Sequence, residues 1–206
     1  MIKLAKIMKL RSMVYTESVK PKHKKRMERK LSLFDENLPL YKMDPPLNDS
    51  RITLKELHEL AAIKPNELFV KEGDDVIKSF LPLIEKNELN VSEEMLSKII
   101  KESGVFIYKL KYHYNRPRPY QVAEAYGIDL NGVELDSMKT PSYPSGHATQ
   151  GYLIGDYLAM KDPMNAEEYK TIGEDIAHSR IIAKAHYKSD KIYGKRLAEY
   201  LLRNLK

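Results

Sequence analysis

Basic, hydroxyl and imidazole side chains recur in three short stretches in the second half of this 206-residue chain. The first stretch holds Lys111 and Arg118, which would lie within about 20° of one helix face if a helix continued between them. Two cations on one side of an element suit an anionic ligand. For this stretch taken alone, a solvated basic helix end stabilised by the helix dipole is the simpler interpretation.

The second stretch, Pro144-Ser145-Gly146-His147, comes directly before a segment of helical period. A helix N-terminus offers free amides and partial positive charge, and a glycine there lets a ligand approach the backbone. With the Ser145 hydroxyl, these groups can hold phosphate oxygens, and His147 would stand beside the bound anion. An ordinary serine N-cap beside a surface histidine explains the pattern equally well. The G-x-S-x-G elbow of a serine hydrolase is not present in this stretch.

The third stretch contains Ser179-Arg180, followed by His186 and Asp190. On a helix, the spacing of His186 and Asp190 lets the carboxylate bond one ring nitrogen and leaves the lone pair of the other free for nucleophilic attack. Such a pair often marks a poised histidine, although a helix-surface pair of small energetic value has the same spacing.

The elements that must position these residues are predicted to be helices. Thr53 and Glu56 form a capping-box pattern, and Ser92 is predicted to cap a later helix. The rings of Pro117 and Pro119 end that helix, because proline lacks an amide donor. No run of alternating β-branched residues competes, so the predicted fold class is all-α. Helices are expected over residues 53–63, 92–114, 146–160 and 166–177, and near the C-terminus.

Residues 119–144 are predicted to form a long irregular connection, which in a compact chain is usually functional. Tyr120, Tyr126 and Tyr143 lie in or at the end of this connection. We expect these tyrosines to overhang the site.

Composition and charge narrow the class of protein. No apolar run approaches the roughly 18 residues of a membrane span, so no transmembrane segment is predicted, and the absence of cysteine excludes thiolate chemistry. Residues 1–30 carry 11 of the 35 Lys and Arg residues, and only two of the 29 acidic ones. We therefore divide the chain into a basic N-terminal segment, 1–40, and a helical domain, 41–206.

Within the basic segment, Ile2, Ala5 and Met8 with a row of lysines predict a short amphipathic helix, and residues 20–30 a charged connector. Two interpretations of residues 1–30 stay open: contact with an anionic surface, or simple solvation of a charged segment. Lysines interrupt any secretory signal, so a cytoplasmic location is expected. The sequence leaves a homo-oligomer open.

Taken together, Lys111-x6-Arg118-Pro119, Pro144-Ser145-Gly146-His147 and Ser179-Arg180-x5-His186-x3-Asp190 resemble the three-part signature of the type 2 phosphatidic acid phosphatase superfamily. Three unrelated coincidences in family order are improbable, whereas one motif alone would be weak. The likeness is greatest to the bacterial class A non-specific acid phosphatases, over about residues 40–206. It implies a single-domain helical bundle of the acid phosphatase/vanadium haloperoxidase type.

The resemblance also implies a role for each residue. His186 would attack phosphorus and form a phosphohistidine, Asp190 would orient its ring, and His147 would protonate the leaving group and then activate water. That double role suits a histidine titrating near neutrality, and it predicts a bell-shaped pH profile. The implied phosphate-binding residues are Lys111, Arg118, Ser145, Gly146 and Arg180. No metal and no cofactor is required, because fixed cations can stabilise the phosphoryl group.

The implied function is that of a metal-independent phosphatase acting on a small-molecule phosphoester. Class A acid phosphatases are exported, and this chain shows no export signal, which puts their setting in doubt. Three alternatives stay open: a vanadium-dependent haloperoxidase, a metal site formed by His147, His186 and Asp190, and a non-catalytic protein that binds anions or nucleic acid.

Overall fold

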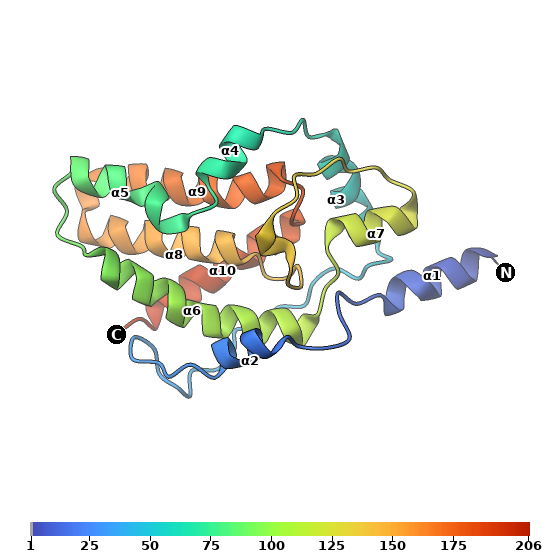
Figure 1. The fold of residues 1–206 in the computed structure, drawn as a ribbon, viewed down its shortest axis with the longest axis horizontal. Coiled ribbons are helices and arrows are strands. Elements are labelled where there is room, and N and C mark those ends of the chain that lie inside the picture. Colours follow the sequence, from blue (N-terminus) through green and yellow to red (C-terminus); the bar gives the residue numbers. More distant parts are fainter. Residues whose placement is uncertain (1) are drawn as a thin grey trace.

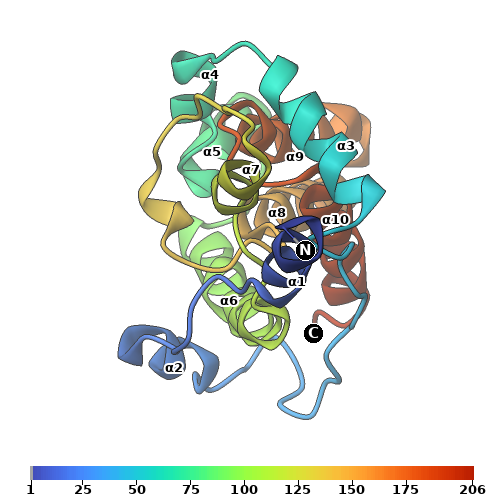
Figure 2. The same cartoon turned by 90° about the vertical axis from the view of Figure 1, so that its right-hand side faces the viewer.

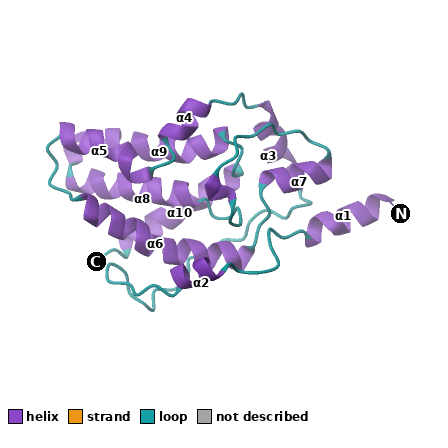
Figure 3. Ribbon diagram, viewed as in Figure 1, coloured by secondary structure: helices purple, strands orange, loops and turns teal. Residues whose placement is uncertain are grey.

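The computed structural model describes residues 2–206, without the side chains of residues 2, 3, 4 and 6. Within this range every regular element is a helix (Figure 1), and no segment is drawn as a strand (Figure 3). The all-α prediction is therefore confirmed. The helices are α1 (Ile2–Ser12), α2 (Pro21–Met27), α3 (Arg51–Ala62), α4 (Glu67–Glu72), α5 (Val76–Lys86), α6 (Glu93–Tyr114), α7 (Pro119–Tyr126), α8 (Gly146–Lys161), α9 (Ala166–Ile182) and α10 (Lys188–Arg203), with short 3-10 helices η1 (Asp136–Met138) and η2 (Pro163–Asn165).

Helices α5, α6, α8, α9 and α10 form the bundle, and α3 and α7 cover one end of it (Figures 1 and 2). Helices α8 and α9 pack with their backbones almost touching. A Cβ added at Gly155 on α8 would lie 2.8 Å from the Tyr169 carbonyl oxygen, and one at Gly173 on α9 would lie 2.7 Å from the Gly151 oxygen. Only glycine permits this close approach, which brings the start of α8, with Gly146 and His147, beside the end of α9, with Arg180.

Helix α6 confirms the prediction for residues 92–114. The Ser92 hydroxyl accepts a hydrogen bond from the Met95 amide at 3.2 Å and caps the helix. Its apolar face joins the main core, where Leu96, Ile99 and Leu110 are fully buried.

The first turn of α3 differs from the capping-box prediction. Ser50 is the N-cap and accepts from the Thr53 amide at 3.2 Å, while the Thr53 hydroxyl donates to the Leu47 carbonyl at 2.8 Å. Glu56 does not return to the helix start; its carboxylate accepts hydrogen bonds from the amide and the hydroxyl of Ser189 in α10. The helix itself agrees with the predicted one to within about two residues, as is usual for helix ends.

Residues 119–144 are less irregular than predicted. Pro119 is the first residue of α7, where a missing amide donor costs nothing because the first turn leaves its amides unpaired. Gly127, with φ of 73°, ends the helix in the left-handed conformation. The prediction of an irregular connection was wrong for the residues of α7, because the proline that follows one helix also begins the next.

The basic segment packs against the domain. Residues 20–30, predicted to be a connector, contain α2, which lies along α6 (Figure 1). Leu31, Leu33 and Phe34 then enter the main core cluster. The division of the chain at residue 40 stays a prediction. The predicted N-terminal helix corresponds to α1, but the side chains of Ile2, Lys3 and Lys6, on which its amphipathic character rests, lie outside the described part.

Among residues 2–206, no helix combines the length and the apolar character that a crossing of the bilayer would need.

Candidate active site

His186 and Asp190 form a buried pair at the start of α10. His186 Nδ1 lies 3.1 Å from Asp190 Oδ2, and both side chains are almost fully buried. The pair does not share one helix face, because His186 lies before the N-cap residue Tyr187. Instead, Asp190 Oδ2 also accepts from the Tyr187 amide at 3.0 Å, so the carboxylate caps α10 and holds the imidazole at once.

Arg118 faces the other nitrogen of the His186 ring. Arg118 Nη1 lies 2.9 Å from His186 Nε2 and also donates to the Ala185 carbonyl at 2.8 Å. Since a guanidinium only donates, Nε2 accepts, and Nδ1 therefore carries the ring proton toward the carboxylate. The remaining donors bond the Thr140 carbonyl at 2.8 Å, its hydroxyl at 3.2 Å and the Ser137 carbonyl at 3.0 Å. Burial lowers the pKa of Arg118 to about 10, which leaves it charged at neutral pH.

Lys111 brings a second cation to the same place from the last turn of α6. Its Nζ lies 2.5 Å from the Pro141 carbonyl oxygen and 3.4 Å from that of Ser142. Burial, with the nearby charge of Arg118, holds the pKa of Lys111 well below its usual value. The two cations meet because Asn115 takes a left-handed φ of 47° and turns the chain, not because a helix continues between them.

The start of α8 contributes in two ways. Ser145 is a fully buried N-cap whose hydroxyl lies 3.4 Å from the Ala148 amide. This is the ordinary capping role that the sequence left open. Gly146 and His147, the first two residues of α8, face the cavity described below.

Asp74, in the loop between α4 and α5, joins two predicted site residues and was not predicted. Arg180 Nη1 donates to Asp74 Oδ1 at 2.7 Å, Nη2 donates to the Val70 carbonyl at 2.6 Å, and Nε donates to the Ser179 hydroxyl at 2.9 Å. His147 Nε2 lies 3.0 Å from the Asp74 carbonyl oxygen and 3.7 Å from Oδ1. The loop therefore links the third motif to the second.

A cavity of about 600 Å³ opens beside these groups. Its lining includes five of the eight predicted site residues: Lys111, Arg118, Gly146, His147 and His186. Ser145, Arg180 and Asp190 are not among the lining residues. Asp190 contacts His186 and Arg180 contacts Asp74, as given above, and the Ser145 amide donates to the Asp190 carbonyl at 3.2 Å.

The tyrosines that were expected to overhang the site do not line the cavity. Tyr143 is 1% exposed, stacks on Tyr193 at 4.5 Å between ring centroids and donates to the Met43 carbonyl at 2.8 Å. The Tyr126 hydroxyl donates to a carbonyl outside the cavity, and Tyr120 is exposed. That expectation is wrong for Tyr126 and Tyr143 because their rings pack into the fold, and the exposed Tyr120 is not among the lining residues either. The segment instead lines the cavity with Asp136, Ser137, Lys139 and Thr140.

Arg116 supports Asp190 from the side opposite the histidine, and the sequence analysis missed it. Arg116 Nη1 donates to Asp190 Oδ1 at 2.6 Å and to the Ser189 hydroxyl at 2.8 Å. Its Nη2 lies 3.5 Å from Glu56 Oε2, and Glu56 in turn accepts from the Ser189 amide at 2.5 Å. The available signal was Glu56 itself, a carboxylate on the apolar face of α3 at helical spacing from Leu60.

This network sets the protonation of the pair. Burial by itself would raise the pKa of Asp190, but Arg116 and the hydrogen bond from His186 hold it well below its usual value. Burial and the positive charge of Arg118 lower the pKa of His186 well below its usual value, against the opposing effect of Asp190. At neutral pH the ring is therefore neutral and its Nε2 lone pair is available.

Within the part of the chain that the structure describes, no three His, Cys, Asp or Glu side chains gather as one metal ion would require. The alternative of a site formed by His147, His186 and Asp190 thus has no geometric support.

Comparison with known proteins assigns the family. The model of the PAP2 superfamily matches residues 95–203, which include all three motifs, and the chain belongs to this superfamily. Two relatives are named as non-specific acid phosphatases of Salmonella typhi and Salmonella typhimurium. Each is 27% identical to this chain, over 177 and 174 residues respectively, or 77% of this chain and 69% of the relative.

A solved structure, that of a bacterial vanadium-dependent iodoperoxidase, has the same fold. Its TM-score is 0.59 at 15% sequence identity, over 81% of this chain. The aligned part spans only 53% of the iodoperoxidase chain, about half its length. At this identity the likeness establishes the helical fold and says nothing about the reaction.

Proposed function

We propose that the protein hydrolyses phosphomonoesters through a phosphohistidine on His186. The observation that carries the proposal is the environment of His186 Nε2, an unprotonated nitrogen that borders the cavity beside Arg118 while Asp190 holds the opposite nitrogen. Membership of the superfamily and the names of the two Salmonella relatives support phosphatase chemistry.

In the first step, the Nε2 lone pair attacks phosphorus and the bond from phosphorus to the ester oxygen breaks. When Nε2 takes the phosphoryl group, it no longer accepts from Arg118, so that Nη1 proton turns to a phosphoryl oxygen. Asp190 stabilises the imidazolium that forms, because its carboxylate stays ionised in this setting.

In this proposal His147 acts as the general acid and then as the general base. It gives a proton to the leaving alkoxide in the first step. It then takes one from the water that attacks the phosphohistidine, which releases inorganic phosphate and restores both histidines. The Asp74 contacts fix His147 Nε2 at the loop, so a small rotation of the ring must accompany its proton transfer to substrate.

Besides the nucleophile, the reaction needs fixed positive charge, because phosphoryl transfer depends on positioning and on charge stabilisation. Lys111 and Arg118 supply that charge at the cavity wall. Arg180, Ser145 and Gly146 complete the proposed set, and Arg180 does so after exchanging part of its contact with Asp74 for a phosphoryl oxygen. With these cations in place, the reaction proceeds without a metal ion.

The proposal is tested with 4-nitrophenyl phosphate in excess chelator. Activity is expected to survive chelation, to be blocked by orthovanadate acting as a mimic of the transition state, and to give an acid-labile, base-stable phosphorylated protein on rapid quenching. Loss of activity on chelation, or a phosphorylated residue other than histidine, would contradict the mechanism. Halide oxidation by peroxide only when vanadate is added would identify the haloperoxidase alternative.

A second prediction concerns pH. Burial and Arg180 lower the pKa of His147 to about 4, below the near-neutral value that the residue type alone suggested. The general acid must be protonated, so kcat/KM for an alkyl phosphate is expected to peak at acidic pH and to fall on the alkaline side. In kcat the fall shifts to higher pH, because a bound phosphate dianion raises the pKa of His147.

Two neighbouring carboxylates in the loop before α5 provide a test of this prediction and its matched control. Asp74→Asn removes a charge that raises the pKa of His147, so the alkaline limb of kcat/KM should move to lower pH. Asp75→Asn removes a neighbouring charge and keeps the oxygen that caps α5, so it should leave the limb in place. A profile that rises steadily from pH 4 to 9 would exclude His147 as the general acid.

A further inference from the structure

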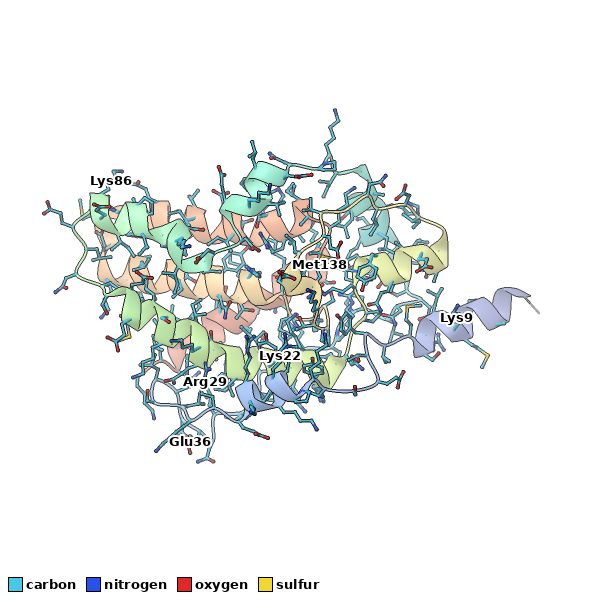
Figure 4. The ribbon with its side chains drawn as sticks, viewed as in Figure 1. Lys9, Lys22, Arg29, Glu36, Lys86 and Met138 are labelled. Atoms are coloured by element: carbon cyan, nitrogen blue, oxygen red, sulfur yellow. The ribbon has the colours of Figure 1, made fainter. Side chains whose placement is uncertain are left out.

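The outer part of the cavity is lined by cations that the proposed reaction does not use. Lys22, Arg26 and Arg29, from α2 and the residues after it, line the same cavity as His186, together with Lys101 of α6. Figure 4 shows Lys22 and Arg29 where the basic segment runs along α6. We call these four residues the basic rim.

Neutral groups hold the two rim arginines. Arg26 Nη1 donates to the Tyr108 hydroxyl, and its guanidinium carbon lies 5.2 Å from the centre of that ring. Arg29 Nη1 donates to the Lys101 carbonyl at 3.2 Å. Among the described residues, none of the four rim cations forms an ion pair with a carboxylate. Their charge is thus available to a ligand.

Carboxylates do little to offset the rim. Asp136 is the one acidic side chain among the residues that line the described cavity, and it is paired with Lys139 at 2.5 Å between Nζ and Oδ1. The lining as a whole therefore carries a clear excess of positive charge, which focuses an attractive potential for anions in the cleft.

The segment that carries the rim is fixed to the domain. His23 is 2% exposed, and its Nδ1 lies 2.5 Å from the Tyr112 hydroxyl on α6. Beyond α2, Glu102 accepts from the amides of Ser32 at 2.9 Å and Leu33 at 2.8 Å. Attachment at these points positions the rim before a ligand arrives, so little ordering is needed on binding.

We propose that the basic rim binds a second phosphate group of the substrate, so that the preferred substrate is a small molecule with two phosphates. This inference rests on the proposed function, because the inner cations Lys111 and Arg118 already meet the phosphate that is cleaved. A dianionic monoester leaves the rim charges unmatched, whereas a bisphosphate satisfies both sets. The cavity of about 600 Å³ lies within the usual range of small-molecule sites.

The test compares matched pairs of substrates: fructose 6-phosphate with fructose 1,6-bisphosphate, and adenosine 5′-monophosphate with adenosine 3′,5′-bisphosphate. For at least one pair, the wild type is expected to show a higher kcat/KM for the bisphosphate than for the monophosphate, through a lower KM. Added salt should lower kcat/KM more steeply for the bisphosphate. In Lys22→Gln/Arg26→Gln this preference should fall about tenfold, as the loss of two charge-assisted contacts implies.

Lys24→Gln/Lys25→Gln is the control, because it removes the same charge from exposed residues of α2 that do not line the cavity. It should leave kcat/KM unchanged for both members of each pair. A wild type without preference for either bisphosphate, or equal effects of the two double variants, would overturn the inference.

Two further outcomes separate this inference from others. If the wild type hydrolyses no monophosphate in excess chelator, the proposed function is wrong. The rim is then still tested by calorimetry, which measures binding of the bisphosphates to the wild type and to both double variants. If the rim variant weakens binding to vesicles of anionic lipid and leaves the bisphosphate preference intact, the rim is a membrane-contact surface and the inference is wrong.

Discussion

Replacement of His186 by alanine is expected to lower kcat/KM for 4-nitrophenyl phosphate by about 10,000-fold or more, since a reaction that depends on a covalent intermediate loses its route when the nucleophile is removed. The cations at the cavity wall remain in His186→Ala, so inorganic phosphate and vanadate should still bind. Rapid quenching should trap no phosphorylated protein. The measurement is single-turnover kinetics with parallel calorimetry of phosphate binding.

His58→Ala provides the control for the loss of an imidazole. His58 is exposed on α3, does not line the cavity, and has no role in the proposed reaction. Its replacement should leave kcat/KM and the free energy of unfolding nearly unchanged. If His186→Ala retained more than about a tenth of the wild-type kcat on the folded protein, water rather than histidine would be the nucleophile.

The parts of the fold that the sequence predicts well depend on local signals. The Ser92 cap and the apolar spacing that follows it lie within one segment, and the helix over 93–114 agrees with both. Errors arose where two segments compete for the same polar group. Glu56 fits a capping pattern with Thr53, but in the fold its carboxylate accepts from Ser189 and lies 3.5 Å from the buried Arg116, both from other parts of the chain.

In the site too, local signals predicted residues that lie together, and contacts between distant segments were not predicted. Five motif residues line one cavity, as their chemistry suggested, yet the geometry that brings them there was not visible in their spacing. Lys111 and Arg118 meet through a left-handed turn at Asn115, and His186 meets Asp190 through a helix cap. Asp74 escaped prediction because its partners lie far away in sequence and only packing between helices brings them near.

Arg116→Met is expected to lower the free energy of unfolding by about 3–5 kcal/mol, because it leaves Asp190 and Glu56 buried without their shared cation. It should also lower kcat more than it changes KM, since Arg116 acts through Asp190 and does not line the cavity. Arg116→Lys, which keeps the charge but cannot bridge both carboxylates in one plane, should recover stability better than kcat. Chemical denaturation and steady-state kinetics measure these effects.

Arg196→Met is a suitable control, because Arg196 is exposed on α10 and forms no ion pair within the described residues. We expect it to lower the free energy of unfolding by no more than about 0.5 kcal/mol.

The pH dependence of stability shows whether charge or packing causes the loss in Arg116→Met. In the wild type, Arg116 and His186 keep the pKa of Asp190 below its unfolded value, which contributes stability above about pH 4 that is lost as the pH falls. Burial already raises the pKa of Glu56 in the wild type, against the charge of Arg116. Without Arg116 we expect the pKa values of both Asp190 and Glu56 to rise, so the variant loses stability relative to the wild type as the pH rises. The gap in unfolding free energy between the wild type and Arg116→Met should therefore be wide at pH 7 and narrow near pH 4. Adding Glu56→Gln to Arg116→Met should restore part of it, because one unpaired carboxylate is then removed. A gap that is constant with pH would mean that Arg116 contributes packing and not charge.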